Sequence, residues 1–219
     1  MLLTEKLYQS TEEIWKNYLT HPFIKGIEDG SLEKEKFRFY MVQDYLYLLE
    51  YAKVFAFGVI KSKDENLMRN FAGFVHGTLD GEMNIHKEYM KRLGITSEEI
   101  KNAETSLANQ SYTSYMLDVA NTGDPLDILV TVLSCQWSYQ VIGQHVAKTK
   151  GTLEHPLYGE WVAGYSCKEY EEMTQEIIDY INILGKNISE EKTEYLKTVF
   201  VNCSRYEYEF WEMADKMEL

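Results

Sequence analysis

The chain has 219 residues, of which 45% are hydrophobic, and it carries a formal net charge of −13 at neutral pH. This length supports one substantial hydrophobic core, so we expect a single domain over residues 1–219. Nucleic acids and anionic membranes select surfaces rich in lysine and arginine, so the acidic balance argues against both as partners. A small molecule or another protein is the expected partner.

The cysteines are Cys135, Cys167 and Cys203, an odd number without CxxC spacing. This pattern indicates neither a disulfide framework nor a zinc site. The N-terminus lacks the regions of a signal peptide, and no apolar run approaches the roughly 18 residues that span a bilayer. We therefore expect a soluble protein of the reducing cytoplasm.

Apolar residues recur at spacings of three and four rather than two, which predicts an all-α fold. Long helices are expected at residues 3–20, 33–62, 64–93, 109–122, 125–149, 166–185 and 189–217. Shorter helical segments are expected near 23–29, 97–102 and 156–164. Capping residues support these bounds, among them Asp124 directly before Pro125.

A carboxylate interrupts the apolar line of the helix expected at 33–62. The line consists of Phe37, Met41, Leu48, Tyr51 and Phe55, and Asp44 takes the missing place in this three-four series. Burying a carboxylate without partners costs several kcal/mol, so Asp44 must meet a donor, a proton or a ligand.

Two other helices also place a reactive group on an inward line. In the final helix, Glu207 fills the gap in the series Leu196, Val199 or Phe200, Cys203, Phe210, Ala214 and Met217. In the helix expected at 125–149, Cys135 lies on the line Ile128, Val132, Tyr139, Ile142 and Val146. Each group alone has a structural explanation, as a core cysteine or a salt-bridge partner. Together they are typical of a site for nucleophilic addition with acid-base help.

A fourth pair, Glu82 and His86, is four residues apart on a line that also includes Phe71, Val75, Leu79 and Tyr89. ExxxH on a helix is a possible metal-ligand geometry, so a metal-dependent oxidase or oxygenase is an alternative. None of the other histidines follows an inward carboxylate at such spacing, which favours a hydrogen-bonded structural pair. Phosphate-binding glycine loops are absent, and we expect neither a metal nor an organic cofactor.

Several blocks resemble the TenA or thiaminase II family of aminopyrimidine aminohydrolases. They are FRFYMVQDYLYLLEYAKVFA at 37–56, GEMNIHKEY at 81–89, SCQWSYQVIG at 134–143, YGEWVAGYSCKEY at 158–170 and YEYEFWEMA at 206–214. The resemblance extends over essentially the whole chain. It implies a single-domain helical bundle of the haem-oxygenase-like type, without haem, assembled as a homotetramer.

The resemblance also implies an activity. Members hydrolyse the substituent on the C5-methylene of aminopyrimidines, converting 4-amino-5-aminomethyl-2-methylpyrimidine, and thiamin, to the 5-hydroxymethyl compound for thiamin salvage. A non-catalytic regulatory role is a third possibility.

The family's roles correspond to residues of this chain. Cys135 would be the nucleophile, Glu207 the proton donor, and Asp44 a ligand for the aminopyrimidine edge. Tyr139 and Tyr165 would contact the substrate, although Tyr158 and Tyr170 lie close to Tyr165 in sequence. Tyr112 would line the site. The Tyr47 hydroxyl would lie near the Cys135 sulfur and assist catalysis.

Overall fold

The computed structural model describes residues 1–219, and its regular elements are helices. The α-helices are α1 (Leu3–Thr20), α2 (Pro22–Asp29), α3 (Lys34–Lys61), α4 (Glu65–His76), α5 (Met83–Leu93), α6 (Ser97–Asn102), α7 (Leu107–Thr122), α8 (Pro125–Val146), α9 (Gly159–Ser166), α10 (Lys168–Leu184) and α11 (Glu190–Lys216). A π-helical turn, η1 (Gly77–Glu82), joins α4 to α5, and a 3₁₀ turn, η2 (Gly185–Asn187), follows α10. The all-α prediction is confirmed, with helix ends that differ from expectation by a few residues.

Both ends of α8 have a local cause. Asp124 Oδ1 accepts hydrogen bonds from the backbone N–H groups of Leu126 and Asp127 at 2.9 and 3.1 Å, so the predicted cap is confirmed. The helix was expected to reach residue 149 but ends at Val146. Beyond it the backbone tightens into turns with bonds spanning three residues, such as the one from Thr149 N–H to the Val146 carbonyl.

The segment predicted as one helix over residues 64–93 contains the π-helical turn η1. Sequence periodicity placed Leu79 on the inward line with His86, and this was wrong, because Leu79 is 38% exposed. Each hydrogen bond of a π-helical turn spans five residues, which wraps one extra residue into the turn. The buried line therefore steps five residues, from Thr78 to Met83, and then continues to His86.

The end of α11 also departs from the inward line expected from the sequence. Met217 was expected to be inward but is 43% exposed. It lies just beyond the last helical residue and has a positive φ of 54°. The helical repeat that would direct its side chain inward has already ended there.

The chain forms two compact units. Unit 1 comprises Met1–Glu33 and Leu129–Trp211, and unit 2 comprises Lys34–Ile128 and Glu212–Leu219. Each unit is built from two separate stretches, and two of the boundaries fall inside α8 and α11. The single domain expected over residues 1–219 stays a prediction.

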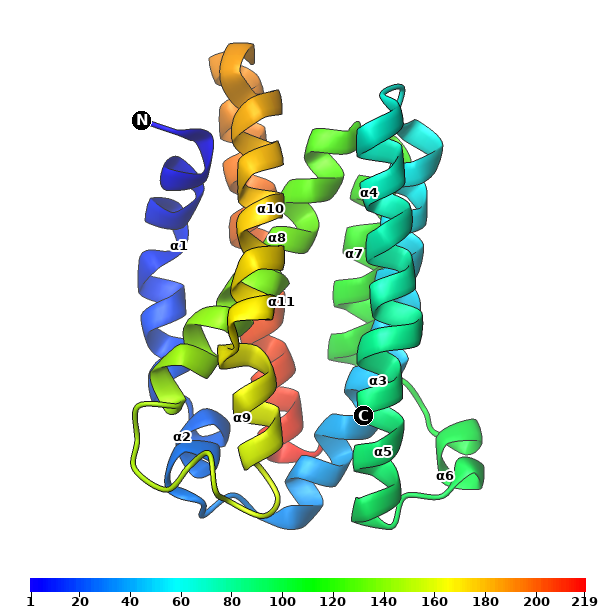
Figure 1. The fold of residues 1–219 in the computed structure, drawn as a ribbon, viewed down its shortest axis with the longest axis vertical. Coiled ribbons are helices and arrows are strands. Elements are labelled where there is room, and N and C mark those ends of the chain that lie inside the picture. Colours follow the sequence, from blue (N-terminus) through cyan, green and yellow to red (C-terminus); the bar gives the residue numbers. More distant parts are fainter. The chain divides into compact units, whose positions relative to one another are not determined.

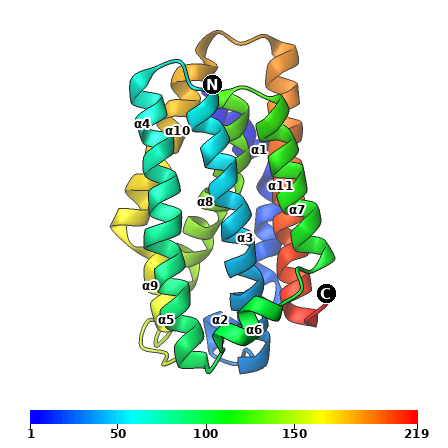
Figure 2. The ribbon, with the colours of Figure 1, turned by 90° about the vertical axis from the view of Figure 1, so that its right-hand side faces the viewer.

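In unit 2, α3 packs against α4, α5 and α7 (Figure 2). The inward line of α3 is buried as expected: Phe37, Met41, Asp44, Leu48, Tyr51 and Phe55. Helices α3 and α4 approach closely at Gly58, because a Cβ added there would lie 2.3 Å from Cδ1 of Phe71. The side chain of Asp44 is buried on the same face of α3 as these apolar residues.

In unit 1, α1 packs against α2 and α10, and α9 packs against α10 (Figure 1). Aromatic contacts connect α1 to two further helices. The Trp15 ring centroid lies 5.4 Å from that of Trp137 on α8 and 5.7 Å from that of Phe200 on α11. Such large rings bury much apolar area, so they anchor the three helices together.

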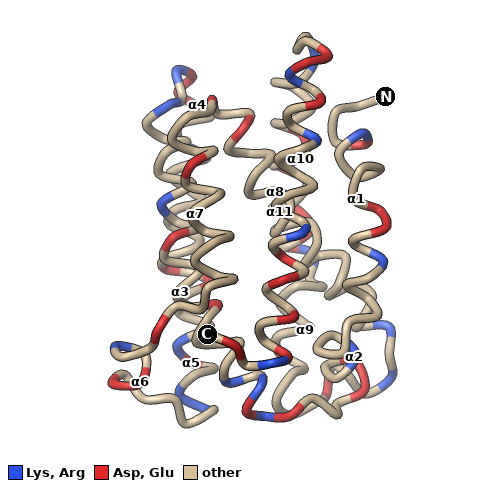
Figure 3. The backbone as a smooth tube through the Cα atoms, turned by 180° about the vertical axis from the view of Figure 1, so that it is seen from behind, with Lys and Arg blue, Asp and Glu red and all other residues tan.

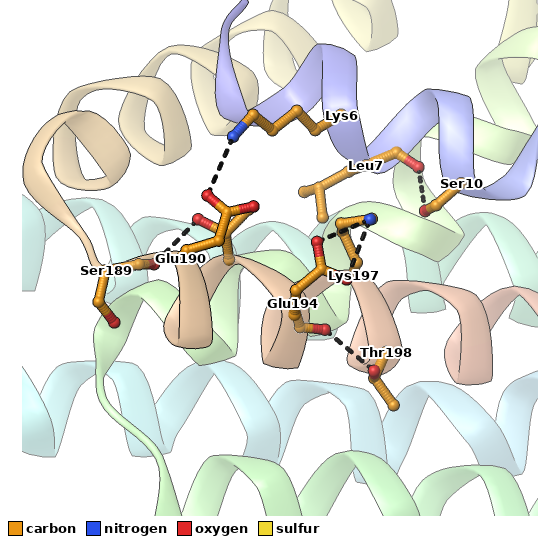
Figure 4. A network of polar contacts seen from close by, with 9 residues as sticks. Lys6, Leu7, Ser10, Ser189, Glu190, Glu194, Lys197 and Thr198 are labelled. Atoms are coloured by element: carbon orange, nitrogen blue, oxygen red, sulfur yellow. Dashed lines mark hydrogen bonds and ion pairs between the residues drawn. The ribbon is translucent and has the colours of Figure 1, made fainter.

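The outer surface carries exposed charges that contribute little to stability. Lys6 of α1 lies 3.9 Å from Glu190 at the start of α11 (Figure 4), and both side chains are exposed. Ser189 Oγ accepts from Lys192 N–H at 3.1 Å and so caps α11. Acidic residues recur along α10 (Figure 3). None of the helices combines the length and the apolar character that crossing a membrane requires.

Candidate active site

Helix α8 in unit 1 carries the candidate nucleophile, Cys135, one turn before Tyr139. Cys135 is half-buried, whereas Cys203 on α11 is fully buried. Burial, and after it the negative charge of Glu207, raises the pKa of Cys203 well above its ordinary value, so this thiol stays protonated. Of these two cysteines, Cys135 is therefore the one suited to nucleophilic chemistry.

Tyr18 on α1 lies near both the candidate nucleophile, Cys135, and the candidate acid, Glu207, in unit 1. Burial raises the pKa of Tyr18 well above its ordinary value, and the negative charges of Glu207 and Cys135 raise it further. Both groups therefore lie within electrostatic reach of this phenol. Sequence reasoning missed Tyr18, although it continues a buried line along α1 that consists of Leu7, Thr11 and Trp15.

A buried polar cluster holds α8 and α11 beside these groups. Ser134 Oγ and Ser204 Oγ are 2.9 Å apart, and Trp15 Nε1 donates to Ser204 Oγ at 3.0 Å. Ser134 directly precedes Cys135, and Ser204 lies three residues before Glu207. Rotating either helix would break a buried hydrogen bond, at a cost of about 1–3 kcal/mol. The cluster therefore fixes the faces on which the thiol and the carboxyl group lie.

Tyr139 and Tyr165 belong to an aromatic cluster formed by α8, α9 and α11. Their ring centroids are 4.7 Å apart. Trp161 and Trp211 lie 6.0 and 5.1 Å from Tyr139. The approach of α9 to α8 requires Gly143, because a Cβ there would lie 2.7 Å from the carbonyl carbon of Tyr165.

The structure distinguishes Tyr165 from its two neighbours in sequence. Tyr165 is buried and contacts Tyr139. The Tyr158 hydroxyl instead donates to the Leu32 carbonyl at 2.5 Å. Tyr170 is half-buried and meets Tyr165 edge-on. These contacts favour Tyr165 as the substrate residue, and its role stays a prediction.

In unit 2, Asp44 on α3 lies against His86 on α5. His86 Nε2 is 2.5 Å from Asp44 Oδ2, and the Tyr40 hydroxyl donates to the same oxygen at 3.2 Å. His86 Nδ1 is 3.0 Å from the carbonyl oxygen of Glu82. Burial alone would lower the pKa of His86, but the Asp44 carboxylate outweighs it and raises the pKa to about 9. The buried Asp44 carboxylate thus has hydrogen-bond donors, as its inward position requires.

Tyr47 and Tyr112 form an aromatic group near the middle of α3 and α7. Their ring centroids are 5.3 Å apart. The Tyr47 hydroxyl donates to Met116 Sδ at 3.7 Å, and its ring stacks on Tyr51 with centroids 5.4 Å apart. Both candidate residues are buried.

A second buried polar cluster holds α3 against α7. Asn109 Nδ2 donates to the backbone carbonyl of Gln43 at 2.8 Å and to its side-chain Oε1 at 3.2 Å. Gln43 directly precedes Asp44, and Asn109 lies three residues before Tyr112. These sequence offsets match those of Ser134 and Ser204 in unit 1. In both units, a buried polar contact sets the rotation of the helices that carry the candidate residues.

Glu82 and His86 form a hydrogen-bonded pair through the backbone carbonyl of Glu82. His86 contacts the backbone carbonyl of Glu82, and its other ring nitrogen faces Asp44. No group of three or more His, Cys, Asp or Glu side chains suited to holding a metal occurs. The partner of His86 across the helices is a carboxylate that sequence spacing did not indicate.

The candidate residues fall into one group per unit. Cys135, Glu207, Tyr139 and Tyr165 belong to unit 1, and Asp44, Tyr47 and Tyr112 belong to unit 2. The expected proximity of the Tyr47 hydroxyl to the Cys135 sulfur stays a prediction. Sequence reasoning missed Tyr18, Ser134 and Ser204, because a buried hydroxyl has no periodic signature of its own.

Comparisons with known proteins find relatives that match this chain over nearly its full length. The aminopyrimidine aminohydrolase of Helicobacter pylori is 46% identical over 98% of this chain and 99% of that protein. The one of Halalkalibacterium halodurans is 44% identical over 98% of this chain and 96% of that protein.

Solved structures with a similar fold include a TenA homologue and a haem oxygenase. A TenA homologue from P. horikoshii OT3 superposes with a TM-score of 0.90 at 29% identity, covering 99% of both chains. Haem oxygenase-1 from Synechocystis sp. PCC6803 reaches a TM-score of 0.70 at 15% identity, over 97% of this chain and 91% of that one. This second likeness shows the fold alone, which is haem-oxygenase-like. A family model described as TENA/THI-4/PQQC matches residues 8–217, and the chain therefore belongs to that family.

Proposed function

We propose that the chain is an aminopyrimidine aminohydrolase of thiamin salvage. It would convert 4-amino-5-aminomethyl-2-methylpyrimidine, and thiamin, to 4-amino-5-hydroxymethyl-2-methylpyrimidine. The observation that carries the proposal is the 46% identity with the Helicobacter pylori aminopyrimidine aminohydrolase over nearly the full length of both chains.

The chemistry explains why a thiol and a carboxyl group are needed. An amine on a ring-bound CH₂ group is a poor leaving group, so electron density must be pushed from the ring. In our proposal the Cys135 thiolate adds to C6 of the pyrimidine, and Glu207 delivers a proton to the adjacent ring nitrogen. The electron-rich ring expels ammonia from the C5-methylene, which leaves an exocyclic methylene group. Water adds to that carbon and loses a proton to give the alcohol. The C6–S bond then breaks, the ring nitrogen returns its proton to Glu207, and the aromatic ring is restored.

Other residues would bind and orient the ring. Asp44 would accept a hydrogen bond from the exocyclic amino group, and Tyr139 and Tyr165 would contact the ring faces. Tyr112 would line the site. The buried positions of these side chains support such roles, because a dry environment strengthens a charge-assisted hydrogen bond.

Formation of the thiolate requires help, because a nearby carboxylate disfavours a second negative charge. Cys135 lies in the middle of α8, where it gains little from the helix N-terminus. We propose that the thiolate exists only transiently, supported by the Tyr47 hydroxyl, while Glu207 carries the proton.

Each step uses proton transfer and a nucleophile, so we propose that neither a metal nor an organic cofactor takes part. The names of the relatives do not favour the metal-dependent alternative.

We further propose that the protein is a cytoplasmic homotetramer. Sedimentation equilibrium would measure the mass of this assembly.

The decisive experiment gives the protein the aminomethylpyrimidine and, separately, thiamin, and follows the hydroxymethylpyrimidine product. We expect turnover by the wild type and a fall in kcat of at least about 100-fold for Cys135→Ser, because serine is the weaker nucleophile. Tyr47→Phe should also lower kcat. Cys167→Ser is the matched control, since this half-buried thiol donates to the Gly164 carbonyl and serine can do the same. A wild type that turns over neither compound would refute the proposed function.

A further inference from the structure

His86 is a buried ionisable residue for which the proposed reaction has no role. Its side chain is 4% exposed and that of Asp44 is 6% exposed. We propose that His86 is a positioning residue, which holds Asp44 by one carboxylate oxygen so that the other accepts the exocyclic amino group of the aminopyrimidine. This inference rests on the proposed function and deepens it.

The contacts of His86 determine where its protons lie. A backbone carbonyl can only accept a hydrogen bond, so Nδ1 must carry the proton that faces the Glu82 oxygen 3.0 Å away. Nε2 then meets the Asp44 carboxylate at 2.5 Å, with one proton between them. The ring is thus fixed at both nitrogens, and its orientation does not depend on a ligand.

The contacts of Asp44 are asymmetric. His86 and the Tyr40 hydroxyl both use Oδ2, at 2.5 and 3.2 Å. Neither uses Oδ1. Two donors on one oxygen fix the plane of the carboxylate and leave the second oxygen to accept from a ligand. One acceptor oxygen suits one N–H donor, which is what an exocyclic amino group offers.

The charge of the pair favours the same role. The cationic ring beside Asp44 stabilises the ionised carboxylate, which accepts hydrogen bonds and donates none. An acceptor of this kind selects a donor on the substrate, and the contact with His86 holds it in place.

A pair of unreactive ligands tests the proposal. 4-Amino-2,5-dimethylpyrimidine retains the exocyclic amino group, and 2,5-dimethylpyrimidine lacks it. We expect the wild type to bind the amino compound about 10- to 100-fold more tightly, because a charge-assisted hydrogen bond is then made in a dry site. In His86→Ala this preference should fall to roughly two-fold, with little change in the affinity for the compound that lacks the amino group.

Two further variants separate positioning from structural support. His86→Gln retains an amide N–H that can reach Oδ2 and should recover part of the preference. In an Asp44→Asn background, His86→Ala should have little additional effect on the preference for the amino compound, because His86 acts through Asp44. The control is His76→Gln, since His76 is exposed and pairs with Asp80, and it should bind as the wild type does.

The wild type provides a measurement that does not depend on a variant folding. In ¹⁵N spectra of the histidine rings, the His86 Nε2 signal should shift on addition of the amino compound and much less with its analogue. Equal loss of affinity for both ligands in His86→Ala, or an unchanged preference, would overturn the inference while wild-type turnover still supports the proposed function. A wild type without turnover that shows no preference between the two ligands would overturn both.

Discussion

Two buried carboxyl groups, Asp44 and Glu207, occupy different chemical surroundings. Asp44 has a cationic histidine and a tyrosine hydroxyl on one oxygen. Glu207 lies near the Cys203 thiol and the Tyr18 phenol, and burial first and then its negative charge raise the pKa values of both groups. A carboxyl group beside a cation suits a fixed acceptor, and one beside weak acids suits proton transfer. The two proposed roles follow from these environments.

The His86–Asp44 pair predicts a pH dependence of stability. The pKa of His86 is raised from 6.5 to about 9 in the folded chain. A raised pKa means that the folded state binds the proton more tightly, so this stabilisation is fully present below about pH 6.5 and is lost as the pH rises through about 9. Its size is on the order of 1–3 kcal/mol.

Urea denaturation of the wild type and His86→Gln measures this effect. The difference between their free energies of unfolding should shrink from about pH 6 to about pH 9.5. Taking the difference cancels the titration of groups that both proteins share. A difference that stays constant over this range would show that the pair does not titrate as described.

At the scale of elements, the close approach of α8 and α9 predicts the effect of one added methyl group. Gly143→Ala would place a Cβ 2.7 Å from the backbone of Tyr165, which cannot move without its helix. We expect destabilisation of about 1–3 kcal/mol, measured by urea denaturation, and a raised KM because Tyr165 shifts against Tyr139.

Gly164→Ala on α9 is the matched control for this change. A Cβ at Gly164 meets nothing within 4 Å. Because alanine is the better helix former, this variant should be as stable as the wild type or slightly more stable. Equal behaviour of the two variants would mean that the approach of the helices is less tight than the distances indicate.

Helical periodicity accounts for what the sequence could predict at this scale. It identified the helices, and it placed Asp44 and Glu207 on inward lines, where both are buried. Periodicity indicates which face of its helix a residue occupies, but not which residues of other helices that face contacts. It therefore missed the contact of His86 with Asp44. It also assumed an uninterrupted α-helix and so misplaced Leu79, because a π-helical turn has no local signal as plain as a proline.

For the whole molecule, the chain path predicts a single unfolding transition. Both α8 and α11 begin in one unit and end in the other, so neither unit can unfold without breaking a continuous helix. We expect the two units to unfold together, as in a single cooperative domain.

The positions of the tryptophans make this testable. Trp15, Trp137, Trp161 and Trp211 are the four tryptophans, and all belong to unit 1. Fluorescence therefore reports on unit 1, and far-UV circular dichroism reports on the helices of both. Coincident denaturation curves are the expected result. A dichroism change without a matching fluorescence change would show that unit 2 unfolds separately.

The π-helical turn η1 makes the position of His86 depend on the number of residues before it. Deleting one of residues 77–81 from this turn would restore an uninterrupted α-helix and rotate the faces of α5 by about 100°. His86 would then leave Asp44, although no residue that contacts either side chain had been substituted. A related chain that is one residue shorter at this turn would need a different partner for its carboxylate, so segment length here is as informative as residue identity.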